Sequence, residues 1–592
     1  MGRECGMNLD STVNRHRPGS AHPAGALFCY NGRSPPLPAG EAIPRVHRLL
    51  PELCALLGAA LWWVTAPATG LSPDGLEMLA VSDCLIGNPC EGVSLGYWPP
   101  LWPALMTLPA ALNLEEWAGR ALNLLLAALV VAPLWRTVDL LQSTERTPRG
   151  PPHLTRWAGA GAAAVWILLP TVREHAVVLD ARPLGWCIGA WCLWATIRAV
   201  RQQQGWGLAV GLAAVAPLAR PEGIALPVLV AAARAGTEGR TGLKGAALGL
   251  LVGLVPHTAF QAAFPSPRGA VEAFFSPWID TWRLEDLLAL YGPASLPTDY
   301  RHFALQTLSE GTLEGPRDLG GLLFAVLGSV RQAPLALGAA VGSGLLGLSV
   351  WGAIRLAQRS RSGLVGVVLG GGLVMAIAAA PMSGGQATRA ANFVGLIPLL
   401  LVAVASVFSA LSVRAAGGEK RGQKHKRGER RSRARRRQGV AVGVLLALVL
   451  EVHLGPLREP APRFLIGTPA ARLAADVLAE DSRLALGPIH AGFEGRGILR
   501  RAGLSPSLLP STWEAFTPAS GDHALLVDAG LIEAGRSLEM LEDPAWRLCW
   551  VAEGDGLPHL SVPPADRTPD VGWVALLRFE QPCLGPASSP SK

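Results

Sequence analysis

The sequence predicts a mostly α-helical, polytopic membrane protein with about eleven transmembrane helices and a small extracytoplasmic α/β domain at its C-terminal end. Three observations predict this fold class: an apolar composition, recurring apolar segments and one concentrated run of basic residues. Of the 592 residues, 50% are hydrophobic and only 16% are charged, and the mean hydropathy is +0.31. Soluble domains carry about 25% charged residues, so this composition excludes a single water-soluble enzyme. It also excludes a disordered chain.

The apolar segments define the membrane domain. A helix needs about 20 mostly apolar residues to cross the hydrocarbon core of a bilayer. Segments that approach or meet this length, some of them short, are found at 49–66, 117–135, 157–170, 183–197, 205–218, 223–233, 245–264, 335–354, 364–380, 391–411 and 440–454.

The basic residues orient these segments. Between Arg414 and Arg437 there are 12 Lys/Arg and two Glu, a local net charge of +10 in a chain whose total is +8. Basic loops stay on the cytoplasmic side, as do Arg45, His47 and Arg48 before the first segment. A run of this kind can also bind nucleic acid. Its position between two apolar segments, without interleaved aromatic residues, favours contact with anionic membrane lipids instead, and we expect no nucleic-acid partner.

This orientation divides the chain into a disordered cytoplasmic tail (1–46), a membrane domain (47–455) and an extracytoplasmic α/β domain (456–592). The last part carries 12 basic and 17 acidic residues, which suits a translocated domain. Its sequence alternates between helical periodicity and short apolar runs typical of strands. Within the membrane domain we expect one basic cytoplasmic loop at 413–438 and outer loops at 67–116, 171–182, 265–319 and 382–390.

The unusual polar residues of the membrane domain collect in the outer loops. Carboxylates and arginines at membrane depth are costly, so they indicate function by default. A carboxylate that can accept a proton, beside cations that can hold phosphate oxygens, suits transfer from a phosphate-linked donor. The candidates are Asp74, Glu77, Asp83, Asp180, Arg182, Arg220, Glu222 and Arg389.

Cysteines agree with this sidedness. Cys84 and Cys90 fall in the first outer loop, and Cys549 and Cys583 in the C-terminal domain. In an oxidising compartment each pair can form a disulfide.

The order of the polar motifs resembles the C-type (GT-C) superfamily of membrane glycosyltransferases, near the protein O-mannosyltransferases and the lipid A aminoarabinose transferases (family 39-like). The resemblance covers about residues 45–415. It is carried, in chain order, by Asp74, Pro99-Pro100-Leu101, Glu115-Glu116 with Arg120, Asp180-Ala181-Arg182-Pro183-Leu184 and a run from Gly207 to Arg220-Pro221-Glu222-Gly223.

The resemblance implies an enzyme that moves a hexosyl or pentosyl group from a polyprenyl-phosphate donor to a lipid, glycan or protein acceptor outside the cytoplasm. An acidic residue of the first outer loop would be the base, and Asp74 is the matching position. Many relatives have Asp-Glu followed by an aromatic residue, whereas this chain has Gly75 and Met78, so Glu77 and Asp83 stay as alternatives. Arg182, Arg220 and Arg389, with Asp180 and Glu222, are the candidates for donor contacts.

The composition also indicates a source. Alanine, glycine, proline and tryptophan are abundant, and only five of the 52 basic residues are lysine, which is typical of a bacterium with a GC-rich genome. The expected location is therefore the bacterial inner membrane.

Each candidate also has a purely structural interpretation. Asp74 can start a helix as its N-cap, Asp180 can pair with Arg182, and Arg220 with Glu222 can form a turn with an ion pair. His175 is expected to be an interfacial side chain rather than a ligand. The sequence shows no His/Cys/Asp cluster with metal-ligand spacing, although the resemblance leaves a divalent metal ion open.

Two other functions stay as alternatives. A transporter or lipid-handling protein would show an internal repeat with broken helices at matching positions, and the sequence has no convincing repeat. Gly75 and Met78 keep open a catalytically inactive relative.

Overall fold

A computed structural model describes the chain in separate stretches. These are residues 45–65, 73–87, 98–112, 114–143, 153–202, 204–239, 244, 251, 255, 258–260, 338, 340–359, 394–404, 469–481, 489–491, 495, 498–499, 502, 504, 507–508, 524–528, 545–553 and 573–579. The expected tail 1–46 except its last two residues, the segments 364–380 and 440–454, and the loops 265–319, 382–390 and 413–438 lie outside the described residues.

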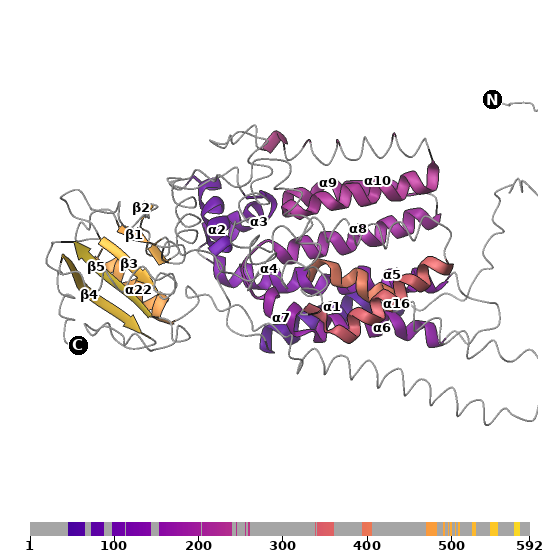
Figure 1. Ribbon diagram of the computed structural model, residues 1–592, viewed down its shortest axis with the longest axis horizontal. Coiled ribbons are helices and arrows are strands. Elements are labelled where there is room, and N and C mark those ends of the chain that lie inside the picture. The colour runs from indigo at the N-terminus through magenta and orange to yellow at the C-terminus, as the bar shows by residue number, and fades with distance from the viewer. Residues whose placement is uncertain are drawn as a thin grey trace, which may run out of the picture. The chain divides into compact units, whose positions relative to one another are not determined.

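The described part of residues 47–455, the predicted membrane domain, is helical (Figure 1). Its elements are α1 (Arg45–Thr65), α2 (Pro73–Leu85), α3 (Leu101–Ala111), α4 (Glu115–Leu129), α5 (Val131–Ser143), α6 (His153–Leu168), α7 (Pro170–Ala176), α8 (Arg182–Gln202), α9 (Trp206–Ala219), η1 (Pro221–Ile224), α10 (Ala225–Glu238), α16 (Ser343–Arg359) and η5 (Val394–Leu396).

Helices α4 and α5 form one long apolar stretch. Trp117–Leu141 has 25 residues and a mean hydropathy of 1.9, and among the described residues it alone is long and apolar enough to cross a membrane. The described residues also contain six shorter apolar helices: Leu49–Thr65, Leu101–Ala111, Ala158–Leu168, Trp206–Ala219, Gly344–Ile354 and Val394–Val404. Five of them overlap predicted segments, whereas Leu101–Ala111 lies in the expected outer loop 67–116.

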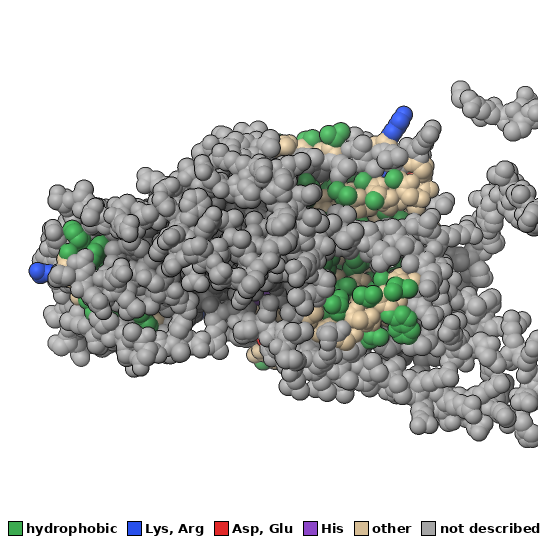
Figure 2. Space-filling view, viewed as in Figure 1, with side chains coloured by type: hydrophobic (Ala, Val, Ile, Leu, Met, Phe, Trp, Pro, Cys, Tyr) green, Lys and Arg blue, Asp and Glu red, His purple; other side chains and the backbone are tan. Residues whose placement is uncertain are grey.

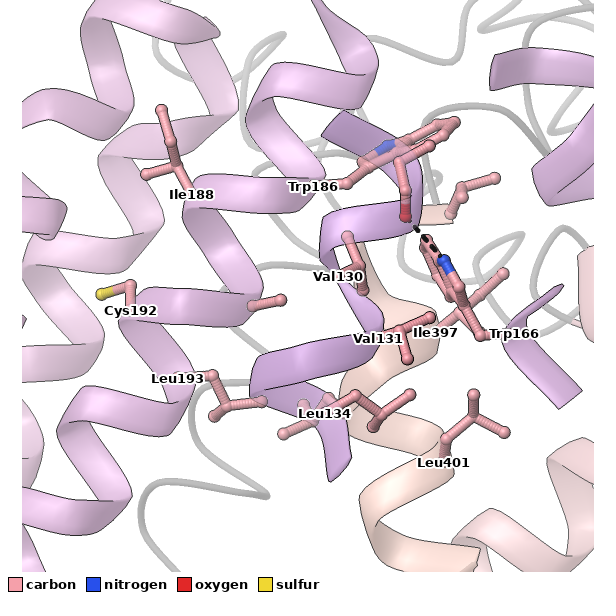
Figure 3. Close-up of a cluster of buried hydrophobic side chains, with 14 of the residues drawn as sticks. Val130, Val131, Leu134, Trp166, Trp186, Ile188, Cys192, Leu193, Ile397 and Leu401 are labelled. Atoms are coloured by element: carbon pink, nitrogen blue, oxygen red, sulfur yellow. Dashed lines mark hydrogen bonds between the residues drawn. The ribbon is translucent and has the colours of Figure 1, made fainter. Parts of the chain in front are cut away.

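The core of the bundle forms around two tryptophans. Trp166 of α6 and Trp186 of α8 meet edge to face, with ring centroids 6.1 Å apart. Trp166 donates its indole N–H to the carbonyl of Ala127 in α4 at 2.8 Å (Figure 3). Aliphatic side chains from α5, α8 and the helix after η5 close around the pair; they include Val131, Leu134, Ile188, Leu193, Ile397 and Leu401. The close packing fixes how α8 lies against α4 and α6.

Large apolar side chains also cover the outside of the helices, and Figure 2 shows hydrophobic groups over the described surface of the bundle. On α1, Leu57 is 69% exposed and Val64 is 82% exposed. Exposed apolar surface of this extent marks a region that contacts something other than water. It agrees with the lipid-facing helices that the sequence predicts.

The C-terminal part contains helix α22 (Pro469–Asp481) and a five-stranded sheet of order β2-β1-β3-β5-β4. The strands are β1 (Ile489–Ala491), β2 (Ser507–Leu508), β3 (Ala524–Asp528), β4 (Trp546–Glu553) and β5 (Trp573–Phe579). Strand β1 runs parallel to β2 and β3, whereas β5 is antiparallel to β3 and β4.

Alternation along the strands separates the two faces of this sheet. Leu526 and Leu576 share a cluster with Ala474 and Leu478 of α22. Leu525 belongs to a different cluster with other β4 and β5 side chains. Helix α22 therefore covers one face of the sheet.

Candidate functional site

A buried ion pair stands at the beginning of α8. Asp180 accepts the backbone N–H of Arg182 on Oδ1 at 2.7 Å, and its Oδ2 lies 2.8 Å from Nη1 of the same arginine. Asp180 is fully buried and Arg182 is 5% exposed. A buried charge needs a partner of opposite sign, so the two residues stabilise each other. The pairing that the sequence left as an alternative is formed.

The ion pair leaves hydrogen-bond donors on Arg182. A guanidinium has five N–H donors, and the contact with Asp180 uses Nη1. Nε of Arg182 is buried without a hydrogen-bond partner among the described residues. Arg182 is also the first residue of a 21-residue helix, and a helix N-terminus carries partial positive charge that favours anions. The start of α8, which already binds the carboxylate of Asp180, can therefore hold an additional oxyanion.

A second arginine ends α9. Arg220 has extended backbone angles, φ −153° and ψ 143°, and its Nε donates to Oε1 of Glu222 at 2.6 Å. Its own N–H donates to the carbonyl of Ala216 at 3.1 Å. Arg220 is 5% exposed. A cation here is favoured by the negative end of the α9 dipole.

The turn after Arg220 depends on a glycine. A Cβ on Gly223 would lie 2.3 Å from the carbonyl oxygen of Ala216, which no side chain can do without a shift of the backbone. The N–H of Gly223 donates to the carbonyl of Arg220 at 2.9 Å. The glycine of the Arg-Pro-Glu-Gly run thus lets η1 fold back onto the end of α9.

Gly185 connects the two arginines. A Cβ on Gly185 would lie 2.9 Å from Cγ of Arg220, so the stem of Arg220 crosses α8 at this residue. Gly185 is three residues after Arg182, and side chains at this spacing share one face of a helix. The structure therefore brings together four predicted residues, Asp180, Arg182, Arg220 and Glu222.

The segment 171–182, predicted as a short polar loop, contains a helix and is largely buried. Helix α7 spans Pro170–Ala176, and Thr171, Glu174 and His175 are among its buried residues. Thr171 donates from Oγ1 to the carbonyl of Ala340 at 2.9 Å. Because these polar side chains meet protein rather than water, the expectation of a loop was wrong.

His175 is likewise buried, at 5% exposed, so it is not the interfacial side chain that the sequence predicted. Burial, with a smaller contribution from the charge of Arg182, lowers the pKa of His175 to about 3. Its Nδ1 has no hydrogen-bond partner among the described residues. The imidazole is therefore neutral at physiological pH.

Helix α2 carries the acidic candidates of the first outer loop. Since α2 begins at Pro73, Asp74 lies in its first turn and Glu77 one turn further, but their side chains lie outside the described part. Asp83 is half-buried near the end of the helix and interacts with a neighbour. The geometry therefore leaves the choice among these three carboxylates where the sequence left it.

Two described cysteines form disulfides, one in the helical part of the chain and one in the C-terminal sheet. Cys84 at the end of α2 and Cys549 in β4 are each disulfide-bonded. Cys90 and Cys583, the partners that the sequence predicts, lie outside the described residues.

Sequence reasoning missed one buried polar residue beside this site. Asn123 of α4 is fully buried. Its Nδ2 donates to the carbonyls of Val178 at 2.8 Å and Asp180 at 3.1 Å, and its Oδ1 accepts from Nε1 of Trp102 at 3.1 Å. A lone Asn inside an apolar segment was the available signal, since polar side chains within spans are usually bonded to neighbouring helices.

Arginines lie beside tryptophans at the opposite end of the bundle. Arg136 of α5 forms an ion pair with Glu52 of α1, and its guanidinium lies 5.4 Å from the ring of Trp191. Arg198 lies 5.3 Å from the ring of Trp194. Arginines beside tryptophans are typical of a membrane–water interface. These contacts pair the helix ends that the predicted alternation places on the cytoplasmic side.

Two predictions about ligands are not tested by the geometry. Arg389 lies outside the described residues. Within the described ranges, no group of three or more His, Cys, Asp or Glu side chains is arranged to hold a metal ion.

No protein-family model and no curated protein matches the chain. Among solved structures, the apo oligosaccharyltransferase of Archaeoglobus fulgidus is similar with a TM-score of 0.47 and 13% identity, over 88% of this chain and 75% of that chain. ArnT from Cupriavidus metallidurans bound to undecaprenyl phosphate is similar with a TM-score of 0.35 and 14% identity, over 89% and 97%. Its apo state gives a TM-score of 0.36 and 13% identity over the same shares. All three TM-scores are below 0.5.

Proposed function

We propose that this chain is a membrane glycosyltransferase that transfers a sugar from a polyprenyl-phosphate donor to an acceptor on the extracytoplasmic face. The observation that carries the proposal is that the stem of Arg220 packs against Gly185, three residues after Arg182 at the N-terminus of α8. The resemblance of the sequence to GT-C enzymes supports the same conclusion.

The guanidinium donors of this site suit a phosphate ester. Arg182 and Arg220 are both buried, and charge-assisted hydrogen bonds from guanidinium groups to phosphate are about twice as strong as neutral ones. Asp180 and Glu222 hold the two guanidinium groups in place before the donor arrives. A site organised in advance in this way spends less binding free energy on ordering its side chains.

The proposed reaction needs one base. Asp74 takes the proton from the acceptor hydroxyl as that oxygen forms a bond to the anomeric carbon of the sugar. The bond between the anomeric carbon and the phosphate oxygen breaks, and its electron pair leaves with the polyprenyl phosphate. Arg182 and Arg220, with Arg389 as a third candidate, stabilise the negative charge that develops on the leaving phosphate.

The same proposal places the protein in a bacterial inner membrane, with its C-terminal domain outside the cytoplasm. The basic run at 414–437 supports this orientation because basic loops stay inside. A lipid-linked donor then reaches the site within the outer leaflet.

Incubation of the purified protein with a panel of polyprenyl-phosphate sugars tests the proposal. We expect turnover by the wild type and its loss in Asp74→Asn, with Glu77→Gln and Asp83→Asn as parallel variants that identify the base. Arg182→Gln should abolish binding of undecaprenyl phosphate. Arg198→Gln, which removes an exposed arginine at the opposite end of the same helix, is the matched control and should bind normally.

Absence of turnover with every donor would overturn the enzymatic function. If undecaprenyl phosphate still bound in that case, an inactive relative or a lipid-handling protein would be the better description. Turnover that survives Asp74→Asn would assign the base elsewhere.

A further inference from the structure

We propose that Asn123 is a positioning residue that holds Arg182 in register with the helix carrying the candidate base. The inference rests on the proposed function, because it assigns Arg182 to the donor phosphate. Its evidence is a buried chain of hydrogen bonds that begins at α2 and ends at the turn before α8.

The orientation of the Asn123 amide is determined by its partners. An indole N–H can only donate, and a backbone carbonyl can only accept. Nε1 of Trp102 therefore requires the oxygen of the amide on its side, at 3.1 Å. The amide nitrogen must then face the carbonyls of Val178 and Asp180, where it lies at 2.8 and 3.1 Å. A flipped amide would lose all three bonds.

The turn between α7 and α8 relies on these bonds. Val178, Leu179 and Asp180 are all buried, and a buried carbonyl that loses one of its donors is destabilised because no water can replace the lost bond. Val178 also accepts the N–H of Asp180 at 3.0 Å, which closes the turn. Because the side chain of Asp180 in turn holds Arg182, the position of the guanidinium depends on the backbone that Asn123 fixes.

The chain of bonds continues to α2. Oγ of Ser82, a fully buried residue, donates to the carbonyl of Pro103 at 2.9 Å. Pro103 follows Trp102 in the first turn of α3. Figure 1 shows α2, α3 and α7 at the same end of the long helices. Ser82, Trp102 and Asn123 therefore connect the helix of Asp74 and Glu77 to the turn that holds Arg182.

Three variants of the full-length protein test this role. Asn123→Ala removes the whole link, and Trp102→Phe removes only the indole N–H while the ring still fills its site. Trp62→Phe is the matched control, because Trp62 is also buried and its Nε1 also donates to a carbonyl, that of Ile167 at 2.9 Å. This control bond joins α1 to α6 and contacts neither the turn nor α8.

Two measurements separate positioning from simple stability. Hydrogen exchange of the peptide covering residues 177–184 reports the turn without any ligand, and binding of undecaprenyl phosphate reports the site. We expect Asn123→Ala and Trp102→Phe to increase exchange in this peptide and to weaken binding about tenfold or more. Trp62→Phe should lower the melting temperature by a similar amount and leave both readouts unchanged.

If Asn123→Ala behaved like Trp62→Phe in both measurements, Asn123 would contribute to stability only and the proposal would be overturned; an effect of Asn123→Ala without one of Trp102→Phe would show that the amide is oriented without the indole N–H. Absence of undecaprenyl phosphate binding by the wild type would overturn the proposed function instead. In that case a selective increase in exchange would still establish that Asn123 holds the turn, so the two failures are distinguishable.

Discussion

Gly185 and Arg220 are in contact across the interface of α8 and α9: a Cβ on Gly185 would lie 2.9 Å from Cγ of Arg220. The absence of a side chain on α8 thus provides the space in which an arginine of another helix lies. The contact can therefore be tested with a substitution that changes no charge.

Gly185→Ala should displace Arg220 and weaken binding of undecaprenyl phosphate by about tenfold, because a contact under 3.0 Å forces the neighbour to move. Gly189→Ala is the control one turn later, where the new Cβ would meet only Leu226 at 4.0 Å. That variant should bind normally and gain about 0.5–1 kcal/mol from helix propensity. Lipid-binding titrations on both proteins check the prediction, and equal affinities would contradict it.

Gly223→Ala should destabilise the protein by roughly 1–3 kcal/mol, since its Cβ would lie 2.3 Å from the carbonyl oxygen of Ala216. Gly207→Ala in the adjoining helix has nothing within 4 Å of the new Cβ and should be neutral or slightly stabilising. Thermal unfolding in detergent compares the two. A melting temperature for Gly223→Ala at or above that of the wild type would show that η1 can move away from α9.

His175 should make stability depend on pH. Its pKa is lowered from 6.5 to about 3 in the folded protein, so the unfolded chain binds a proton below pH 6.5 that the folded chain refuses. Stability is therefore lost as the pH falls. Acidification from pH 7.5 to 5 should reduce the free energy of unfolding by about 2 kcal/mol through this residue.

The pH effect is measured as a difference between two proteins. His175→Gln cannot titrate in this range, so its melting temperature should fall less than that of the wild type between pH 7.5 and 5. Identical pH profiles would mean that His175 is protonated in the folded state.

The two ends of the bundle should face opposite sides of the membrane. Leu112 at the end of α3 is 58% exposed, and Gln204 between α8 and α9 is exposed as well. In intact spheroplasts an impermeant maleimide should label Leu112→Cys, whereas Gln204→Cys should react only after permeabilisation, because basic ends stay inside. The unsubstituted protein controls for native thiols, and the reverse pattern would invert the predicted orientation.

The apolar segments with clear punctuation were predictable. Helix α9 extends over Trp206–Ala219, close to the predicted 205–218, because Gly205 precedes the apolar run and Arg220-Pro221 follows it. The same residues predicted the turn at Arg220, and the ion pair with Glu222, which the sequence left as an alternative, is formed. At both ends of α9, the backbone that the local sequence favours is the one that the packed structure adopts.

Helix α7 and Asn123 were not predictable in this way. The side chains of Thr171, Glu174 and His175 are polar, and periodicity assigns such a segment to the surface. Their burial depends on neighbours distant in the sequence, such as Ala340. Asn123 was passed over because a single amide hardly changes the hydropathy of a 25-residue apolar helix. The position of the carboxylate of Asp74 relative to Arg182 is set by tertiary contacts that no local pattern encodes.

Helix α8 begins at Arg182 and carries Arg198 near its other end. At 1.5 Å per residue the two arginines are about 24 Å apart along the axis, somewhat less than the thickness of a hydrocarbon core. In the orientation proposed above, with Arg198 and Trp194 near the cytoplasmic headgroup layer, Arg182 would lie close to the outer one. Under the proposed function, the lipid donor would bring its phosphate to this depth by lateral diffusion alone, with its polyprenyl chain among the acyl tails throughout the reaction.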